Sequence, residues 1–193
     1  MRRAAAIWLF CLLPVLSGCA AVVVGGVAVG ALALHDRRPL PDLVEDQGIE
    51  MAATRTFQKD EKLALDSHIR VVSYNGIVLL AGEVPDEEAK ARAERITRQH
   101  DGVRRVVNEL ALRDPTHVGT RLKDTGLTAR VKAAIAGIDR EGFDATRVKV
   151  VTVRGNVYLM GLVTQDEATA VVEKVRYVNG VNRVVKVFEY LAG

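Results

Sequence analysis

The amino-acid sequence predicts an α+β fold built from two copies of one small domain, each with the element order αββαβ. Three observations carry this prediction. An internal repeat divides most of the chain into two halves, apolar residues recur at helical spacing in some parts of each half, and apolar residues alternate on both sides of a glycine turn in others. Each copy is expected to form a mixed three-stranded sheet with two helices covering one face.

The internal repeat sets the expected domain boundaries. Three stretches of the first half align with the second half at offsets of 78 or 79: residues 46–49 with 124–127, 71–82 with 150–161, and 102–107 with 180–185. These alignments predict a first domain over residues 46–114, a linker over 115–123 and a second domain over 124–193.

The second copy shows the elements most clearly. Apolar residues at helical spacing predict an amphipathic helix over residues 127–138, and a hairpin follows around Gly155. A second helix is expected to open at Thr164, because Glu167 three residues later completes a capping box. A strand over residues 184–190 closes the copy.

The first copy repeats this order. Its hairpin is expected to turn at Asn75-Gly76, the dipeptide that best tolerates the positive φ angles of a tight β-turn. Its second helix opens at Pro85-Asp86, and the acidic residues there are explained by the positive end of the helix dipole rather than by catalysis. A strand over residues 106–112 closes the copy.

The N-terminus predicts export and lipidation. Residues 1–18 combine a basic start, an apolar stretch and a small-residue end, which is the pattern of a signal peptide. The end, Leu16-Ser17-Gly18-Cys19, resembles the lipobox of bacterial lipoproteins, so Cys19 is the expected lipidation site. It would also be the one sulfhydryl left after cleavage. Ala20 after the cysteine favours the outer membrane by the same resemblance.

The segment after the cysteine is expected to be a tether. Residues 20–34 are apolar but short and interrupted by glycines, so they do not suit a membrane span. Residues 35–45 carry Pro39, Pro41 and mixed charge, which is typical of an extended linker, with Arg37 and Arg38 as exposed linker charge. Residues 19–45 are therefore expected to form a lipidated tether and linker.

The charge of the chain gives no indication of a nucleic-acid partner. Cleavage before Cys19 leaves 25 basic and 24 acidic side chains, a net charge of +1. The distribution is uneven, because residues 46–114 have a net charge of −2 and residues 121–193 have a net charge of +4. An anionic partner should therefore prefer the second half.

The sequence offers no active site. It contains no nucleophile elbow, phosphate-binding loop or dinucleotide fingerprint. The four histidines have no metal-ligand spacing and are interpreted as surface residues: His35, His68, His100 and His117. No enzymatic activity, metal or other cofactor is predicted.

The repeat unit resembles the BON domain, an αββαβ module of bacterial envelope proteins. The resemblance covers residues 46–191 and depends on glycines at the positions that family keeps: Gly76, Gly82 and Gly102 in one copy, and Gly155, Gly161 and Gly180 in the other. A lipobox followed by two such modules is similar to the dual-BON lipoproteins of the Gram-negative outer membrane. The resemblance implies a periplasm-facing lipoprotein that supports outer-membrane integrity.

The first helix of the second copy is the expected lipid-binding surface. It carries basic residues around an apolar end and has no acidic residue between Thr125 and Ile138, a combination that suits anionic phospholipid. The predicted contact residues are Arg121, Lys123, Gly126, Leu127, Arg130, Val131 and Lys132. In lipid-binding members of the resembled class an aromatic residue occupies the position of Gly126, so this chain departs from the pattern there.

Two alternatives remain open at this level. Val131 and Ile135 also suit core packing against the sheet, and Leu127 fits either environment. The whole protein also fits a second function, a scaffold for envelope assembly or division proteins. In that case the acidic first domain or the sheet faces would bind the partner, and the membrane would matter only through Cys19.

Overall fold

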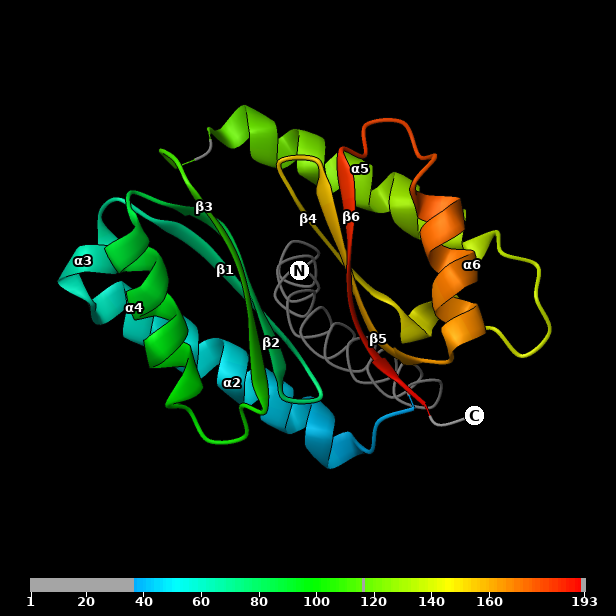
Figure 1. Ribbon diagram of the computed structural model, residues 1–193, viewed down its shortest axis with the longest axis horizontal. Coiled ribbons are helices and arrows are strands. Elements are labelled where there is room, and N and C mark those ends of the chain that lie inside the picture. The colour runs from blue at the N-terminus through cyan, green and yellow to red at the C-terminus, as the bar shows by residue number, and fades with distance from the viewer. Residues whose placement is uncertain (1–36, 116, 192–193) are drawn as a thin grey trace, which may run out of the picture. The chain divides into compact units, whose positions relative to one another are not determined.

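The computed structural model describes residues 37–115 and 117–191, which contain two αββαβ domains (Figure 1). The first domain consists of α2 (Leu40–Lys59), α3 (Glu61–Ala64), β1 (His68–Tyr74), β2 (Ile77–Val84), α4 (Glu87–Arg98) and β3 (Arg105–Leu112). The second consists of α5 (Val118–Ala136), the 3₁₀ turn η1 (Ala145–Arg147), β4 (Lys149–Val153), β5 (Asn156–Val163), α6 (Gln165–Val175) and β6 (Arg183–Tyr190). The α+β fold and the element order are as predicted.

Each domain has a mixed three-stranded sheet with its middle strand in the centre. The strand orders are β1-β2-β3 and β4-β5-β6. In both sheets the first pair is antiparallel and closed by a hairpin, whereas the second pair is parallel and connected through a helix. A parallel pair needs such a crossover, because a short turn cannot bring the chain back to the same end of the sheet.

The hairpin turns and helix starts form where the sequence indicates. Asn75 and Gly76 have φ angles of 52° and 68°, the left-handed conformation that a tight two-residue turn requires. The second helix of the second domain has the full capping box: Thr164 accepts a hydrogen bond from the Glu167 amide, and Glu167 accepts one from the Thr164 amide. Asp86 caps α4 by accepting from the Ala89 amide at 2.7 Å.

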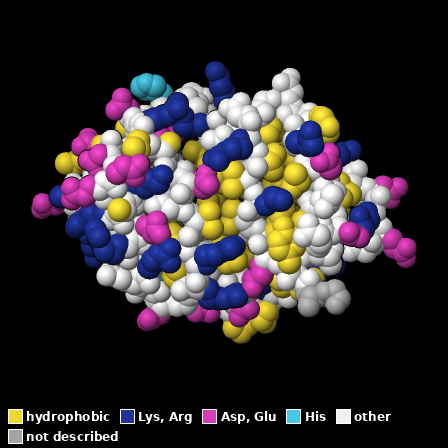
Figure 2. Space-filling model, viewed as in Figure 1, with side chains coloured by type: hydrophobic (Ala, Val, Ile, Leu, Met, Phe, Trp, Pro, Cys, Tyr) yellow, Lys and Arg dark blue, Asp and Glu magenta, His cyan; other side chains and the backbone are white. Residues whose placement is uncertain are grey.

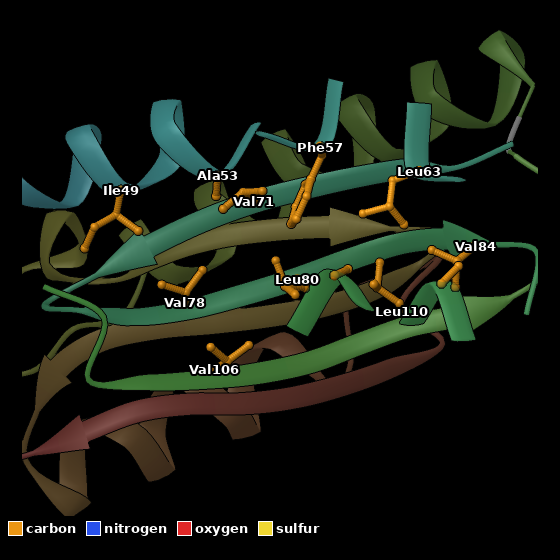
Figure 3. Close-up of a cluster of buried hydrophobic side chains, with 12 residues drawn as sticks. Ile49, Ala53, Phe57, Leu63, Val71, Val78, Leu80, Val84, Val106 and Leu110 are labelled. Carbon is orange, nitrogen blue, oxygen red and sulfur yellow. The ribbon is translucent and has the colours of Figure 1, made fainter. Parts of the chain in front are cut away.

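One face of each sheet packs against the helices of its own domain. In the first domain α2 contributes Ile49, Ala53 and Phe57, which lie over alternate residues of the strands (Figure 3). In the second domain α5 contributes Leu127 and Val131 to the corresponding cluster. Because side chains alternate along a strand, each sheet keeps a second set of apolar residues for its other face.

The other faces of the two sheets meet in a third apolar cluster. It joins residues of the first sheet to residues of the second: Val72, Tyr74, Ile77, Leu79 and Ala81 with Val151, Val153, Tyr158, Met160 and Val187. Apolar side chains of this region reach the surface between β3 and β6, with charged side chains beside them (Figure 2). The second faces of the two sheets therefore pack against each other, and the apolar area buried there adds to the small core of each domain.

Ion pairs between the domains surround this cluster. Arg183 pairs with Glu109 at 2.5 Å and Arg104 with Glu189 at 2.8 Å. Lys149 of the second domain binds Glu50 of α2 at 2.8 Å and also donates to the carbonyl of Ser73 at 3.1 Å. These partly exposed pairs add geometric specificity to the apolar contact more than they add free energy.

The prediction of an extended linker is wrong for residues 37–45, because residues 40–45 form the first part of α2 and the residues just before the helix are packed. Arg38 pairs with the buried carboxylate of Asp46, and its guanidinium lies 3.6 Å from the centre of the Tyr74 ring. Arg37 binds Glu167 of the second domain at 2.8 Å. Pro39 and Pro41 led to the linker prediction, but they stand at the N-cap and in the first turn of α2, where proline is well tolerated.

Helix α5 likewise begins earlier than the sequence indicated. It starts at Val118, inside the expected linker over residues 115–123, and ends at Ala136. Gly119, Gly126 and three threonines lower the helix propensity of this stretch, and packing against the sheet overrides that preference.

Candidate functional site: the exposed face of α5

Helix α5 buries one narrow stripe in the core of the second domain. Leu127, Val131 and Ile135 are at most 3% exposed and pack against the sheet and α6. Leu127 and Val131 were among the residues expected to touch lipid. The structure places both side chains in the core, because positions 127, 131 and 135 share the helix face that the sheet covers.

The opposite face of α5 presents different apolar residues. Val118 is 63% exposed and Leu122 is 68% exposed. At 100° per residue, Leu122 lies opposite the centre of the buried stripe. Val118, Gly126 and Ala129 lie on the same side as Leu122, within about 40° of its direction around the helix axis. Gly126 and Ala129 are exposed as well. We call these four residues, Val118, Leu122, Gly126 and Ala129, the outer stripe.

Four exposed cations flank the outer stripe. Arg121 and Lys132 lie along one side of it, and Lys123 and Arg130 lie along the other. The structure thus brings together all four predicted cations on the exposed surface of one helix. Val118 and Leu122 were not among the residues predicted for this surface, although their spacing of four residues is a signal that the sequence contains.

The one acidic residue of α5 points away from this surface. The carboxylate of Asp124 accepts hydrogen bonds from the amides of Arg154 at 2.7 Å and Gly155 at 2.9 Å, and so holds the β4–β5 turn. Asp46 does the same for the first domain, accepting from the amides of Asn75 and Gly76. The repeat had aligned these two aspartates without indicating their function. As a result the exposed face of α5 is cationic without an opposing carboxylate.

The equivalent helix of the first domain has the same stripe without the cations. At an offset of 78, the outer stripe corresponds to Leu40, Val44, Gly48 and Met51 of α2, of which Leu40, Val44 and Met51 are exposed large apolar residues. The four cations, however, correspond to Leu43, Glu45, Ala52 and Thr54. The exposed apolar stripe is therefore a property of both copies. The cations at these four positions belong to the second copy alone, whereas α2 has one exposed cation on this face, Arg55, at the position of Ala133.

Gly126 occupies an open position on the outer stripe. A Cβ built there would meet nothing closer than a nitrogen of the Arg130 guanidinium at 3.7 Å. A large side chain would therefore fit at this position. The glycine does not serve a special backbone conformation, because it lies within the regular helix.

Other predicted features fall outside this surface. Cys19 and the preceding leader lie outside the described residues. Among the helices of residues 37–115 and 117–191, none has the length and apolar character to cross a membrane. In the same residues no group of three or more His, Cys, Asp or Glu is placed to hold a metal ion.

Residues 45–114 and 123–192 each match the BON domain family, so the chain belongs to this family and contains two of its domains. Outer membrane lipoprotein DolP of Haemophilus influenzae is 36% identical over 176 residues, which cover 91% of this chain and 90% of that protein. The 21 kDa hemolysin of Actinobacillus pleuropneumoniae is 33% identical over 156 residues, which cover 81% of this chain and 79% of that protein.

A solved structure of CdsD, a structural protein of the type III secretion system of Chlamydia trachomatis, is similar over 77% of this chain and 64% of that chain. Its identity is 19% and its TM-score is 0.29, so no conclusion about fold or function follows from it. The similarity to the DolP lipoprotein extends over nearly the whole chain. The protein is accordingly a dual-BON lipoprotein of the Gram-negative outer membrane.

Proposed function

We propose that the second BON domain docks on anionic phospholipid through the exposed face of α5, and that this non-enzymatic contact supports outer-membrane integrity. The observation that carries the proposal is the outer stripe bordered on both sides by Arg121, Lys132, Lys123 and Arg130. A cationic border attracts anionic headgroups, and the exposed Val118 and Leu122 side chains enter the boundary between headgroups and acyl chains.

The energetics of this contact are modest and suit a tethered protein. A cation near an anionic membrane surface contributes about 1 kcal/mol, and inserted apolar side chains add a similar amount. We propose that acylation of Cys19 supplies the permanent anchor, with residues 20–36 joining it to the folded domains. Tethering raises the local concentration of α5 at the bilayer, so a weak docking surface is sufficient.

A vesicle flotation assay tests the proposal. The mature chain without its acyl group, residues 20–193, is mixed with phosphatidylglycerol or phosphatidylcholine vesicles, because an acyl chain would bind both. We expect flotation with phosphatidylglycerol and its loss in the double variant Arg130→Glu, Lys132→Glu. The control variant Lys59→Glu, Arg95→Glu changes the net charge equally at exposed positions of the first domain and should float like the wild type.

Two results would overturn lipid docking by α5. The unmodified mature chain could fail to float with phosphatidylglycerol at low salt, where electrostatic attraction is strongest. Alternatively, the α5 variant and the first-domain control could lose flotation equally, which would mean that net charge alone, and not this helix face, determines the binding.

A second function, a scaffold for envelope proteins, is favoured by one specific observation. Helix α2 exposes Leu40, Val44 and Met51 without the four cations that flank the stripe of α5, and Glu45 beside them is exposed. Such a surface suits a protein partner better than an anionic membrane. Crosslinking in cells followed by purification tests this alternative: a stoichiometric partner lost in Val44→Ser, together with no vesicle binding, favours the scaffold over lipid docking.

A further inference from the structure

The loop between α6 and β6 lies directly beside the basic border of α5. Arg130 donates from a guanidinium nitrogen to the carbonyl of Asn179 at 3.4 Å. A Cβ built on Gly180 would lie 3.2 Å from the same guanidinium and 3.7 Å from the Leu127 side chain. Residues 176–182 therefore extend the exposed surface of α5 on the side where Lys123 and Arg130 lie.

This loop carries an exposed aromatic residue. Tyr177 is 75% exposed, the second-highest exposure among the exposed large hydrophobic side chains. The neighbouring Val178 packs against the core of the second domain and so holds the loop in place. The guanidinium of Arg176 lies 4.9 Å from the centre of the Tyr177 ring and is also paired with Glu173 at 3.0 Å.

The repeat shows that this aromatic is specific to the second domain. At an offset of 78, the first copy has Gln99 in place of Tyr177, while Arg98 and Gly102 match Arg176 and Gly180. Tyr177 thus follows the same distribution as the four cations of α5, which the first copy also lacks. Helix α5 itself contains no aromatic residue.

We propose that Tyr177 is a second membrane-contact point, which inserts its ring at the headgroup level of phospholipid while Arg130 and the other α5 cations bind the anionic headgroups. This inference rests on the proposed function of α5. Tyrosine is suited to this depth because its ring is apolar and its hydroxyl reaches water or headgroups. The α6–β6 loop and α5 then form one docking surface with two elements, and this fixes the rotation of the domain on the membrane.

The chain offers a clean spectroscopic test. The sequence has a single tryptophan, Trp8, which lies in the leader, so the variant Tyr177→Trp of residues 20–193 has one tryptophan at the proposed contact. We expect its emission to shift to shorter wavelength with phosphatidylglycerol vesicles and to be quenched by brominated acyl chains. Unchanged emission under conditions where the same protein floats with the vesicles would overturn the inference and leave α5 docking intact.

Affinity measurements provide the second readout. Tyr177→Ser should weaken partitioning to phosphatidylglycerol vesicles roughly five- to tenfold, whereas Tyr177→Phe should stay within about twofold of the wild type. Leu65→Ser, which removes an exposed apolar side chain from the first domain, is the matched control and should not change partitioning. Equal partitioning of Tyr177→Ser and wild type would refute the Tyr177 contact, while failure of every protein to bind would refute α5 docking as well.

Discussion

Leu122 and Leu127 lie on opposite sides of α5, and replacing each by alanine separates folding from membrane docking. Leu127 is 3% exposed and sits in the core of the second domain, whereas Leu122 is 68% exposed. The same chemical change at two positions five residues apart should therefore give opposite patterns. Leu127→Ala should lower stability, and Leu122→Ala should lower affinity for vesicles.

The magnitudes follow from burial. Removing a buried leucine side chain costs about 2–5 kcal/mol, because apolar contacts are lost and a cavity remains. A change at an exposed position stays within about 0.5 kcal/mol. For binding, full burial of a leucine is worth about 1.5–3 kcal/mol. Because two-thirds of Leu122 is available for insertion and alanine retains one carbon, the loss should be about 1 kcal/mol, or roughly fivefold.

Urea unfolding and vesicle flotation of the same two variants measure both effects. Leu127→Ala should lower the free energy of unfolding at unchanged denaturant dependence, with a fall in Tm of at least about 5 °C. Leu122→Ala should unfold like the wild type and partition less to phosphatidylglycerol. If instead Leu127→Ala left stability unchanged, or Leu122→Ala destabilised the fold and bound vesicles normally, the assignment of the two helix faces would be wrong.

Three further predictions concern other residues of the second domain. Gly126→Trp should strengthen vesicle partitioning roughly tenfold without loss of Tm, because the position is open and interfacial tryptophan is favourable; equal partitioning in flotation would contradict this. Asp124→Ala should lower the free energy of unfolding, measured with urea, by about 2–4 kcal/mol, because two turn amides lose their acceptor. Asp124→Asn should lower it less, and a free energy of unfolding equal to that of the wild type would show that the turn does not need the carboxylate. Burial alone would raise the pKa of Glu167, but hydrogen bonds from Arg37 and the Thr164 amide outweigh it and lower the pKa below the usual 4.5. The ionised carboxylate of Glu167 therefore contributes fully to stability above about pH 4.5, and this contribution is lost as the pH falls through the lowered pKa. Wild type and Glu167→Gln should differ in free energy of unfolding at pH 7, and the difference should shrink as acid protonates Glu167; a difference that does not change with pH would refute the sign.

Much of the fold could be predicted because its signals are local. The Asn75-Gly76 turn and the Thr164 capping box each depend on residues close together in sequence, and both form as expected. The start of α2 was missed for a non-local reason. Arg38 contacts Asp46 and the Tyr74 ring, and Arg37 pairs with Glu167, which lies 130 residues later in the sequence. Contacts with distant residues therefore order a segment whose composition is typical of a linker.

The candidate site was predicted in part. Arg130 and Lys132 were placed on the predicted helix over residues 127–138, whereas Arg121 and Lys123 were expected in the linker before it. The structure puts all four on α5. The apolar contacts were assigned to the wrong face. Helix α5 has apolar residues on two opposite sides, Leu122 on one and Leu127 on the other, and periodicity alone does not say which side meets the sheet. Tyr177 was missed because the contact of its loop with α5, through Asn179 and Gly180, exists only in the folded domain.

The two copies together show which residues serve the fold and which serve the surface. Asp46 and Asp124 hold equivalent hairpin turns, so this position is structural in both domains. The outer stripe is shared as well, which means that an exposed apolar helix face does not by itself identify a membrane contact. The differences lie in the border of that stripe and in the adjoining loop, where cations and Tyr177 in one copy replace Glu45, Gln99 and neutral residues in the other. Transferring the four cations to α2 should therefore give the first domain an affinity for anionic vesicles. Glu45 is exposed, and Leu43, Ala52 and Thr54 are half-buried, so long basic side chains at these positions can extend to the surface and leave the fold unchanged.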